Sequence, residues 1–205
     1  METKEYYKPI VLIGGGGHAS VLMDILHRQK RDVVCVVSPD AVLSRRIFSD
    51  LNHVKDDKDI SHYHPDQVLL VNGLGMGRSS SKRRELNNYF VSLGYKFTSV
   101  ISQSAYISDY VVLGEGIHIL PQVVIQPGVV IGSNTIINTG ALIEHDSSVG
   151  DFSHIAPRVV LCGDVSIGDD VFIGAGAVIV NGVSIGCKQF VKAGSIVKMQ
   201  SKGVF

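Results

Sequence analysis

The chain has 205 residues, and its 19 lysines and arginines balance its 19 aspartates and glutamates, so the formal net charge at pH 7 is zero. This length suits two small domains, and the absence of a basic stripe argues against binding to nucleic acid. Glycine and polar residues interrupt each apolar run before the roughly 18 residues of a membrane span are reached, so no membrane span is expected.

The first eight residues are rich in charge and do not resemble a signal peptide. The cysteines, Cys35, Cys162 and Cys187, lie far apart without CxxC spacing, which is typical of reduced thiols. The histidines between positions 53 and 64 lie in a polar loop and are expected to be solvated. We therefore expect a cytoplasmic protein without a metal site.

The N-terminal part begins with an apolar run, Pro9 to Ile13, that predicts a buried parallel strand. A glycine turn, Gly14 to Gly17, follows at once, and apolar residues at helical spacing come after it. A strand, a glycine turn and a helix begin a doubly wound nucleotide-binding unit, in which the backbone can approach a phosphate at the helix N-terminus. The glycines alone also fit a tight structural turn.

Two further strands complete the expected sheet. Val33 to Val37 leads into Ser38-Pro39-Asp40, and Gln67 to Val71 leads into Asn72-Gly73-Leu74-Gly75-Met76-Gly77. No acidic residue stands at the tip of the second strand, so this is not a dinucleotide fingerprint. The domain spans residues 1–101, roughly half a dinucleotide fold, and a mononucleotide moiety suits that size better than NAD.

A helix is expected over Ser80 to Leu93, with Arg83, Arg84 and Glu85 on its exposed face. The strand from Phe97 to Ile101 then leads into the second domain, residues 102–205.

A hexapeptide repeat fills this second domain, because every sixth residue from Ile107 to Val197 is isoleucine, leucine or valine. Such a period marks a solenoid whose coils bury their apolar faces by stacking. A glycine often follows the repeat aliphatic, as at Gly174, and suits a corner because glycine accepts positive φ. Each hexad is therefore expected to be a short strand and a turn.

The repeat resembles the hexapeptide signature of left-handed parallel β-helices, and the left hand is implied by that resemblance. In such a fold three hexads make one triangular coil, so that residues eighteen apart stack about 4.8 Å from each other.

The densest break in the repeat is Asn138-Thr139-Gly140 to Glu144-His145-Asp146. His145 occupies a turn position, two residues after the repeat aliphatic Ile143, so its ring should project outward. An imidazole suits proton abstraction at neutral pH, and a neighbouring carboxylate such as Asp146 can orient the ring and stabilise its protonated form. The alternative is an ordinary surface histidine beside a surface aspartate.

Two more histidines, His118 and His154, each precede a repeat aliphatic on outward strand positions. They are 36 residues apart and should lie on one face, two coils from each other, whereas His154 is half a coil from His145. Within one subunit His145 and His154 therefore cannot share a site, although they could meet across a symmetric trimer. His118 is favoured as an interface packing residue.

Taken together, the glycine loop with His18 and Ala19, Asn138-Thr139-Gly140, the His145–Asp146 pair, His154 and Gly163-Asp164-Val165 resemble one family. It is the bacterial sugar O/N-acyltransferase family, which includes bacillosamine-pathway nucleotide-sugar N-acetyltransferases and sialic acid O-acetyltransferases. The resemblance implies a Rossmann-like N-terminal domain, a left-handed β-helix, a homotrimer with active sites between subunits, and acetyl-CoA as co-substrate without a metal.

The resemblance also implies roles for residues of the β-helix. The family's catalytic base matches His145, and the acid that modulates it matches Asp146. A histidine in the acetyl-CoA site, contributed by the adjacent subunit, matches His154. A backbone N–H that holds the thioester carbonyl matches Gly163, one coil beyond the base. Contacts to the pantetheine match Ala193 and Gly194.

In the N-terminal domain, the resemblance implies that the glycine loop holds the phosphates of a nucleotide-activated sugar. Asn72-Gly73-Leu74-Gly75 departs from the family's usual Ile-Gly-Asp/Asn-Asn, and Ser38-Pro39-Asp40 keeps one acidic residue. The expected nucleotide-sugar-binding residues are Gly15, Gly16, Gly17, His18, Ser38, Asp40, Asn72 and Gly73.

The function expected from these residues is acetyl transfer to the amino group of a nucleotide-linked amino-deoxysugar, for surface glycan biosynthesis. O-acetylation of sialic acid or a related glycan sugar is the alternative. A pure scaffold would not need the His145–Asp146 pair or the glycine loop. An enzyme of the carbonic anhydrase type needs about three metal-binding histidines per site, and His118, His145 and His154 do not have that spacing.

Overall fold

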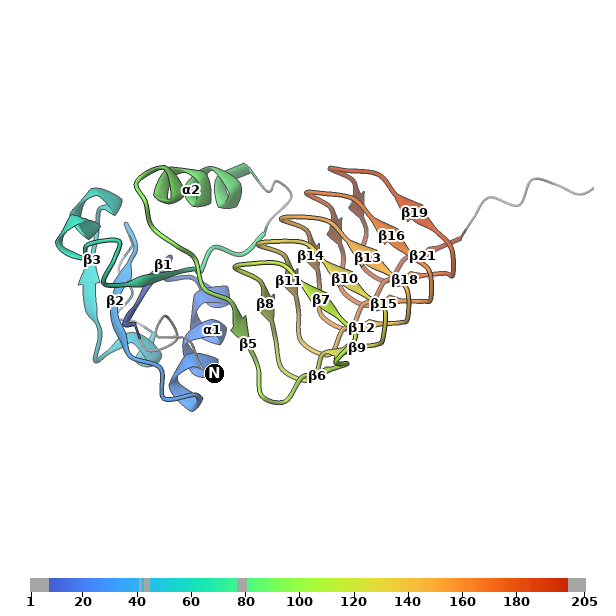
Figure 1. Cartoon of the computed structure of the whole chain (residues 1–205), viewed down its shortest axis with the longest axis horizontal. Helices are drawn as coiled ribbons and strands as arrows, with labels where there is room; N and C mark the ends of the chain where they lie inside the picture. The colour runs from blue at the N-terminus through green and yellow to red at the C-terminus, as the bar shows by residue number, and fades with distance from the viewer. Residues whose placement is uncertain (1–7, 41, 43–44, 77–80, 199–205) are drawn as a thin grey trace, which may run out of the picture. The chain divides into compact units, whose positions relative to one another are not determined.

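The structure, a computed structural model, describes residues 8–40, 42, 45–76 and 81–198. The chain divides into two compact units, Met1–Val100 and Ile101–Phe205, which are described separately (Figure 1). No helix in the described part of the chain is long and apolar enough to cross a membrane.

The first unit is built on a four-stranded parallel sheet with the order β3-β2-β1-β4. Its strands are β1 (Ile10–Ile13), β2 (Val33–Val37), β3 (Asn52–Val54) and β4 (Leu69–Asn72). β1 and β4 are buried along their whole length, as the apolar runs predict. The edge strand β3 escaped prediction because it is short and begins with two polar residues.

The helices are α1 (Gly17–Arg28) and α2 (Ser81–Ser92), with 3-10 turns at Arg46–Phe48 and Asp57–His62. α1 buries an apolar stripe made of Ala19, Leu22, Met23, Ile25 and Leu26. α2 was expected from Ser80, which lies outside the described residues. The prediction that Arg83 lies on the exposed face of this helix is wrong, because the residue is only 2% exposed.

The second unit consists of three parallel sheets, one of five strands and two of six, typical of a left-handed β-helix. The strands are β5 (Val100–Ile101), β6 (Tyr106–Ile107), β7 (Val112–Leu113), β8 (His118–Ile119), β9 (Val124–Ile125), β10 (Val130–Ile131), β11 (Ile136–Ile137), β12 (Leu142–Ile143), β13 (Ser148–Val149), β14 (His154–Ile155), β15 (Val160–Leu161), β16 (Ser166–Ile167), β17 (Phe172–Ile173), β18 (Val178–Ile179), β19 (Ser184–Ile185), β20 (Phe190–Val191) and β21 (Ile196–Val197). Each strand pairs with the strands one coil before and after it, so the fold class predicted from the repeat is confirmed.

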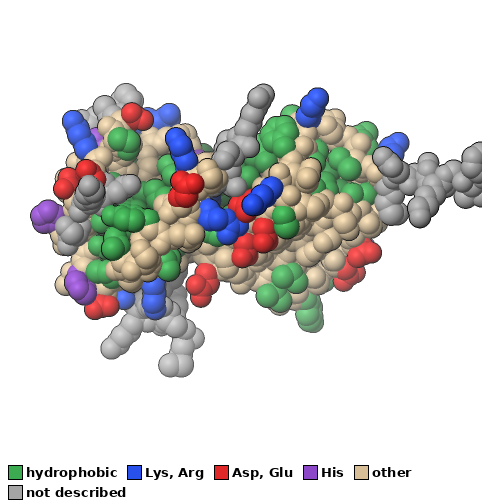
Figure 2. Space-filling model, turned by 90° about the horizontal axis from the view of Figure 1, so that it is seen from above, with side chains coloured by type: hydrophobic (Ala, Val, Ile, Leu, Met, Phe, Trp, Pro, Cys, Tyr) green, Lys and Arg blue, Asp and Glu red, His purple; other side chains and the backbone are tan. Residues whose placement is uncertain are grey.

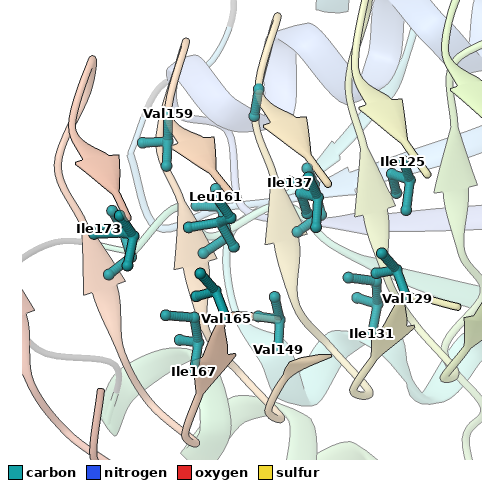
Figure 3. Packing of buried hydrophobic residues seen from close by; sticks show 14 of the residues in the cluster. Ile125, Val129, Ile131, Ile137, Val149, Val159, Leu161, Val165, Ile167 and Ile173 are labelled. Carbon is teal, nitrogen blue, oxygen red and sulfur yellow. The ribbon is translucent and has the colours of Figure 1, made fainter. Parts of the chain in front are cut away.

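The repeat aliphatics point inward and stack in columns, as Figure 3 shows for Ile131, Val149 and Ile167. Smaller residues two positions earlier fill the corners of the triangle, among them the buried polar side chains of Thr135 and Ser153. Their hydroxyls donate to the carbonyls of Gly150 and Gly168, at 2.7 and 2.8 Å. These two buried hydroxyls are therefore paired.

The glycines that follow the repeat aliphatics do not adopt positive φ, so the conformational reason expected for them is wrong. Positive φ occurs two residues further on, at positions such as Gly128 and Asp146. Glycine is needed at a position such as Gly174 for space, because a Cβ there would meet the backbone nitrogen of Ala193 in the next coil. Close stacking of the coils therefore excludes a side chain at Gly174.

Candidate active site

A hydrogen-bonded pair of polar side chains lies at the corner of the β-helix between β12 and β13. His145 and Asp146 follow Ile143 in this turn, and their side chains are 60% and 70% exposed. The Nδ1 of His145 lies 2.8 Å from Oδ2 of Asp146. Asp146 has a φ of 60°, a conformation that aspartate tolerates better than most residues, and its N–H donates to the carbonyl of Pro127 in the preceding coil.

The carboxylate of Asp146 fixes the chemistry of the imidazole. An ionised carboxylate only accepts hydrogen bonds, so Nδ1 carries the hydrogen and the neutral ring keeps a lone pair on Nε2. The pKa of His145 is raised above its usual value, first by the hydrogen bond to Asp146 and further by the charges of Asp146, Glu144 and Asp164. The pair can therefore accept a proton at Nε2 and stabilise the resulting imidazolium.

Glycines in the two flanking coils make room for this pair. A Cβ at Gly163, eighteen residues after His145, would lie 2.7 Å from Cε1 and 2.8 Å from Nε2 of the imidazole. A Cβ at Gly128, eighteen residues before Asp146, would lie 2.6 Å from Oδ1 of the carboxylate. The ring therefore lies against the backbone of Gly163, one coil beyond it, and Gly128 is a supporting residue that was missed.

The backbone N–H of Gly163 has no acceptor among the residues that the structure describes. Its neighbours in the turn are engaged, because Cys162 donates to Ile179 and Asp164 donates to His145, at 2.9 and 3.0 Å. A free N–H beside an imidazole is the arrangement that stabilises a developing oxyanion while a base removes a proton.

His154 lies on β14, in the sheet to which neither β12 nor β13 belongs, and so away from the turn that holds His145, as the half-coil offset predicted. Its Nε2 lies 3.1 Å from Nδ2 of Asn138, and its ring packs edge-on against Phe172 with centroids 5.1 Å apart. It shares a face with His118, two coils away, with Ile136 between them. One chain therefore does not bring His154 to the His145–Asp146 pair.

Ala193 and Gly194 lie at a third place, the exposed turn between β20 and β21. Gly194 has a φ of 68°, and its N–H donates to the carbonyl of Ala175. Because this corner is not the one that holds Gly163, the coenzyme contacts expected at the two positions do not converge within one chain. Their role remains a prediction.

In the first unit the structure gathers most of the predicted nucleotide-binding residues at the C-terminal ends of β2, β1 and β4. Gly14 donates to the carbonyl of Val37, and Gly73 donates to that of Ile13, at 2.6 and 2.7 Å. Ser38 and Asn72, which end β2 and β4, are 5% and 2% exposed. Asp40 is exposed beyond β2, and no hydrogen bond or ion pair among the described residues joins it to this edge.

The glycines of this edge are of two kinds. A Cβ at Gly15 would meet the side chain of Val42, and a Cβ at Gly73 would lie 2.8 Å from the Cβ of Ala19, so packing requires both. Gly16 and Gly17 would meet nothing within 4 Å. Gly16 is the N-cap of α1 with a φ of −80°, so neither packing nor conformation demands glycine there. Close approach of a ligand to the helix N-terminus would account for it.

Of the histidines expected in a solvated polar loop, His53 instead belongs to β3 and is only partly exposed. His53 bonds the carbonyl of Ser38 through Nε2, and His62 bonds that of Asp59 through Nδ1, each at 2.9 Å. Both line a groove beside β3. In the described ranges of the chain, no group of three or more histidine, cysteine, aspartate or glutamate side chains could hold a metal ion.

Sequence reasoning missed two residues of these sites, Gly128 and Arg83. The eighteen-residue offset from Asp146 could have identified Gly128. Arg83 gave no sequence signal, because it lies between Lys82 and Arg84 in a polar stretch and yet bonds the carbonyls of Asn72 and Leu74.

Comparison with known proteins agrees with this fold. The family model described as bacterial transferase hexapeptide (six repeats) matches residues 110–145 and 146–181. A histidine-to-asparagine variant of perosamine N-acetyltransferase from Caulobacter crescentus, in complex with CoA and GDP-perosamine, is 32% identical over 93% of this chain and 88% of that chain, with a TM-score of 0.83.

Two further solved structures share the fold at lower identity. The acetyltransferase domain of PglB from Neisseria gonorrhoeae, in complex with acetyl coenzyme A, is 23% identical over 93% of this chain and 91% of that one, with a TM-score of 0.83. WeeI from Acinetobacter baumannii is 21% identical over 94% and 97%, with a TM-score of 0.71. The chain belongs to the hexapeptide-repeat family of acetyl-CoA-dependent sugar acetyltransferases.

Proposed function

We propose that the chain transfers the acetyl group of acetyl-CoA to the amino group of a nucleotide-linked amino-deoxysugar. The observation that carries the proposal is the His145–Asp146 pair, whose Nε2 faces the backbone of Gly163. The likeness to an enzyme in complex with CoA and GDP-perosamine supports the choice of both substrates.

Each residue of the site has its own role in the proposed reaction. The sugar amine attacks the thioester carbonyl carbon, and Nε2 of His145 takes the proton that the nitrogen loses. The N–H of Gly163 donates to the carbonyl oxygen as it gains charge. The carbon–sulfur bond then breaks, and the imidazolium returns the proton to the leaving thiolate of CoA. Asp146 stabilises the imidazolium between these two steps.

The acidic surroundings of His145 favour an amine over a hydroxyl as the acceptor. The pKa of the imidazole is raised by the hydrogen bond to Asp146 and by the charges of Asp146, Glu144 and Asp164, so these carboxylates make the local potential negative. A negative potential attracts the ammonium form of an amino sugar, which becomes the attacking amine once it has lost one proton to solvent, and gives a neutral hydroxyl no such advantage. This supports N-acetylation over the alternative, O-acetylation.

We assign the nucleotide to the first unit. The N-terminus of α1 offers free N–H groups and positive partial charge, and Gly16 and Gly17 leave its first turn open to a phosphate. His18 follows in the same turn, while Ser38, Asn72 and Gly73 border it at the ends of the neighbouring strands. Asp40, the one acidic residue after β2, is a further candidate for the nucleoside.

We further propose a homotrimer with active sites between subunits, because two of the three outward faces are rich in apolar residues. One face carries Phe172 and Phe190 beside His154, while Ile136 and His118 of the same face are already buried within the chain. The second face carries Leu142, Val160, Val178 and Ile196. The third carries Val112 and Val130 in its first coils and serines at Ser148, Ser166 and Ser184 after them. Figure 2 shows hydrophobic side chains that reach the surface of the β-helix. On the second face, Ile196 is 64% exposed.

A closed ring of three copies uses two different patches on each subunit, which suits a prism with two apolar faces. Such a ring would let His154 of one copy and His145 of the next line one acetyl-CoA site, with Ala193 and Gly194 along the same coenzyme.

Replacing His145 by alanine is expected to lower kcat by about 10²–10⁴-fold, the usual loss when a general base is removed. CoA release measured with acetyl-CoA and an amino-sugar nucleotide tests this. A loss below about fivefold would contradict the assignment of the base.

Sedimentation equilibrium should return a trimer for the wild type and for the His145→Ala variant alike, and a monomer would contradict the proposed assembly.

The acid limb of kcat/KM should depend on Asp146. The base works only when neutral, so activity falls as the pH drops through the raised pKa of His145. Asp146→Asn removes the charge that raises this pKa, so the acid limb should move to lower pH while the plateau falls. Both profiles are measured with the same acceptor, whose own ionisation then cancels. Superimposable acid limbs would show that Asp146 does not set the pKa of the base.

Gly16→Val is expected to raise the KM for the nucleotide sugar by about tenfold or more, because the side chain blocks the approach of a phosphate to the helix. The KM for acetyl-CoA should stay unchanged and serves as the internal control. The fold should survive, since a Cβ at this position meets nothing within 4 Å. Unchanged KM values for both substrates would assign the loop a purely structural role and favour a nucleotide-free acceptor such as sialic acid.

A further inference from the structure

The first turn of α2 carries a buried arginine that the proposed reaction does not use. Arg83 is 2% exposed and is the bulkiest of the fully buried side chains in the described part of the chain. Taking a guanidinium out of water costs several kcal/mol, and an apolar side chain of the same size would fill the space without that cost. A charged group kept at such a position calls for a reason beyond packing.

The contacts of Arg83 converge on the segment that follows β4. Its Nη1 donates to the carbonyls of Asn72 and Leu74, at 2.7 and 2.8 Å. Asn72 returns a hydrogen bond from Nδ2 to the carbonyl of Arg83, at 3.1 Å, and accepts one from the N–H of Leu74 at Oδ1. The backbone from Asn72 to Leu74 is thus fixed on both sides by side chains, and Arg83 supplies two of the bonds.

This fixed segment lies directly against the glycine loop of α1. A Cβ at Gly73 would lie 2.8 Å from the carbonyl oxygen of Ile13 and from the Cβ of Ala19. A Cβ at Gly75 would lie 3.4 Å from the Cβ of His18. The segment after β4 therefore packs on the first turn of α1, next to the open Gly16 and Gly17.

The positive charge of Arg83 supports the same role as its hydrogen bonds do. Burial lowers the pKa of Arg83 to about 9, so the guanidinium still carries its charge at neutral pH. A cation in a region of low dielectric acts over a longer distance than one in water. The guanidinium of Arg83 lies behind the glycine loop and the segment after β4, at the N-terminus of α1. Its charge there adds to the positive potential that attracts a diphosphate.

We infer that Arg83 is a positioning residue for the nucleotide-sugar acceptor: it holds the segment Asn72–Gly75 against the N-terminus of α1 and places a positive charge behind the phosphate-binding surface. The inference rests on the proposed nucleotide-sugar substrate. Arg83 acts through the backbone that it holds, so its loss weakens acceptor binding and leaves the coenzyme site of the β-helix unchanged.

The test compares the wild type with Arg83→Met, which removes charge and hydrogen bonds, and Arg83→Lys, which keeps the charge but cannot reproduce the guanidinium geometry. Arg28→Met is the matched control, because it removes an exposed arginine of the same unit whose partner is Asp24. The KM for the nucleotide sugar and for acetyl-CoA are measured in each variant, together with the midpoint of thermal unfolding.

We expect Arg83→Met to raise the acceptor KM by about tenfold or more, with an acetyl-CoA KM within about twofold of wild type. Arg83→Lys should fall between the two, and Arg28→Met should match the wild type. If Arg83→Met does not fold, Arg83→Lys decides through the same pair of KM values. An acceptor KM that stays at the wild-type value in Arg83→Lys and in any folded Arg83→Met would overturn the inference. A wild type that does not turn over any nucleotide sugar would instead overturn the proposed function.

Discussion

Hydrogen bonding between successive coils is the constraint on which the rest of the β-helix depends. At the corner of the candidate site, Glu144 donates to Leu161 at 2.9 Å and Asp164 donates to His145 at 3.0 Å. The ladder fixes an offset of eighteen residues, so each side chain has known neighbours one coil before and one coil after. A polar pair in one turn is therefore shaped by residues in three coils, and the pair of His145 and Asp146 is bounded by Gly163 and Gly128.

The glycines of the two units are required for different physical reasons. In the β-helix, Gly163 and Gly174 leave space for a ring or a backbone in the neighbouring coil, so their absent side chains are explained by packing. In the first unit, Gly15 and Gly73 are explained in the same way, whereas Gly16 and Gly17 face open space. Within the first unit, Gly16 and Gly17 therefore point to a ligand, because they stand at a helix N-terminus where an anion binds well.

The repeat made the β-helix predictable, because a strict six-residue period is compatible with few folds and fixes which residues stack. The same period led to the outward pair His145–Asp146 and to Gly163 beside it. The corner conformations could not be read from glycine alone, since asparagine and aspartate adopt positive φ at equivalent turns, as at Asn134 and Asp164. Arg83 could not be found either, because its burial is decided by tertiary packing and not by the pattern of its own helix.

The most direct test of the account is the turnover of Gly163→Ala against that of Gly186→Ala. Both are corner glycines of the β-helix without positive φ, but a Cβ at Gly163 would lie 2.8 Å from Nε2 of His145, whereas one at Gly186 meets nothing within 4 Å. Displacing the imidazole should lower kcat of Gly163→Ala by at least about tenfold, with the thermal midpoint kept. Gly186→Ala should turn over like the wild type. Wild-type turnover in Gly163→Ala would contradict the claim that the imidazole, held against this backbone, is the base of the reaction.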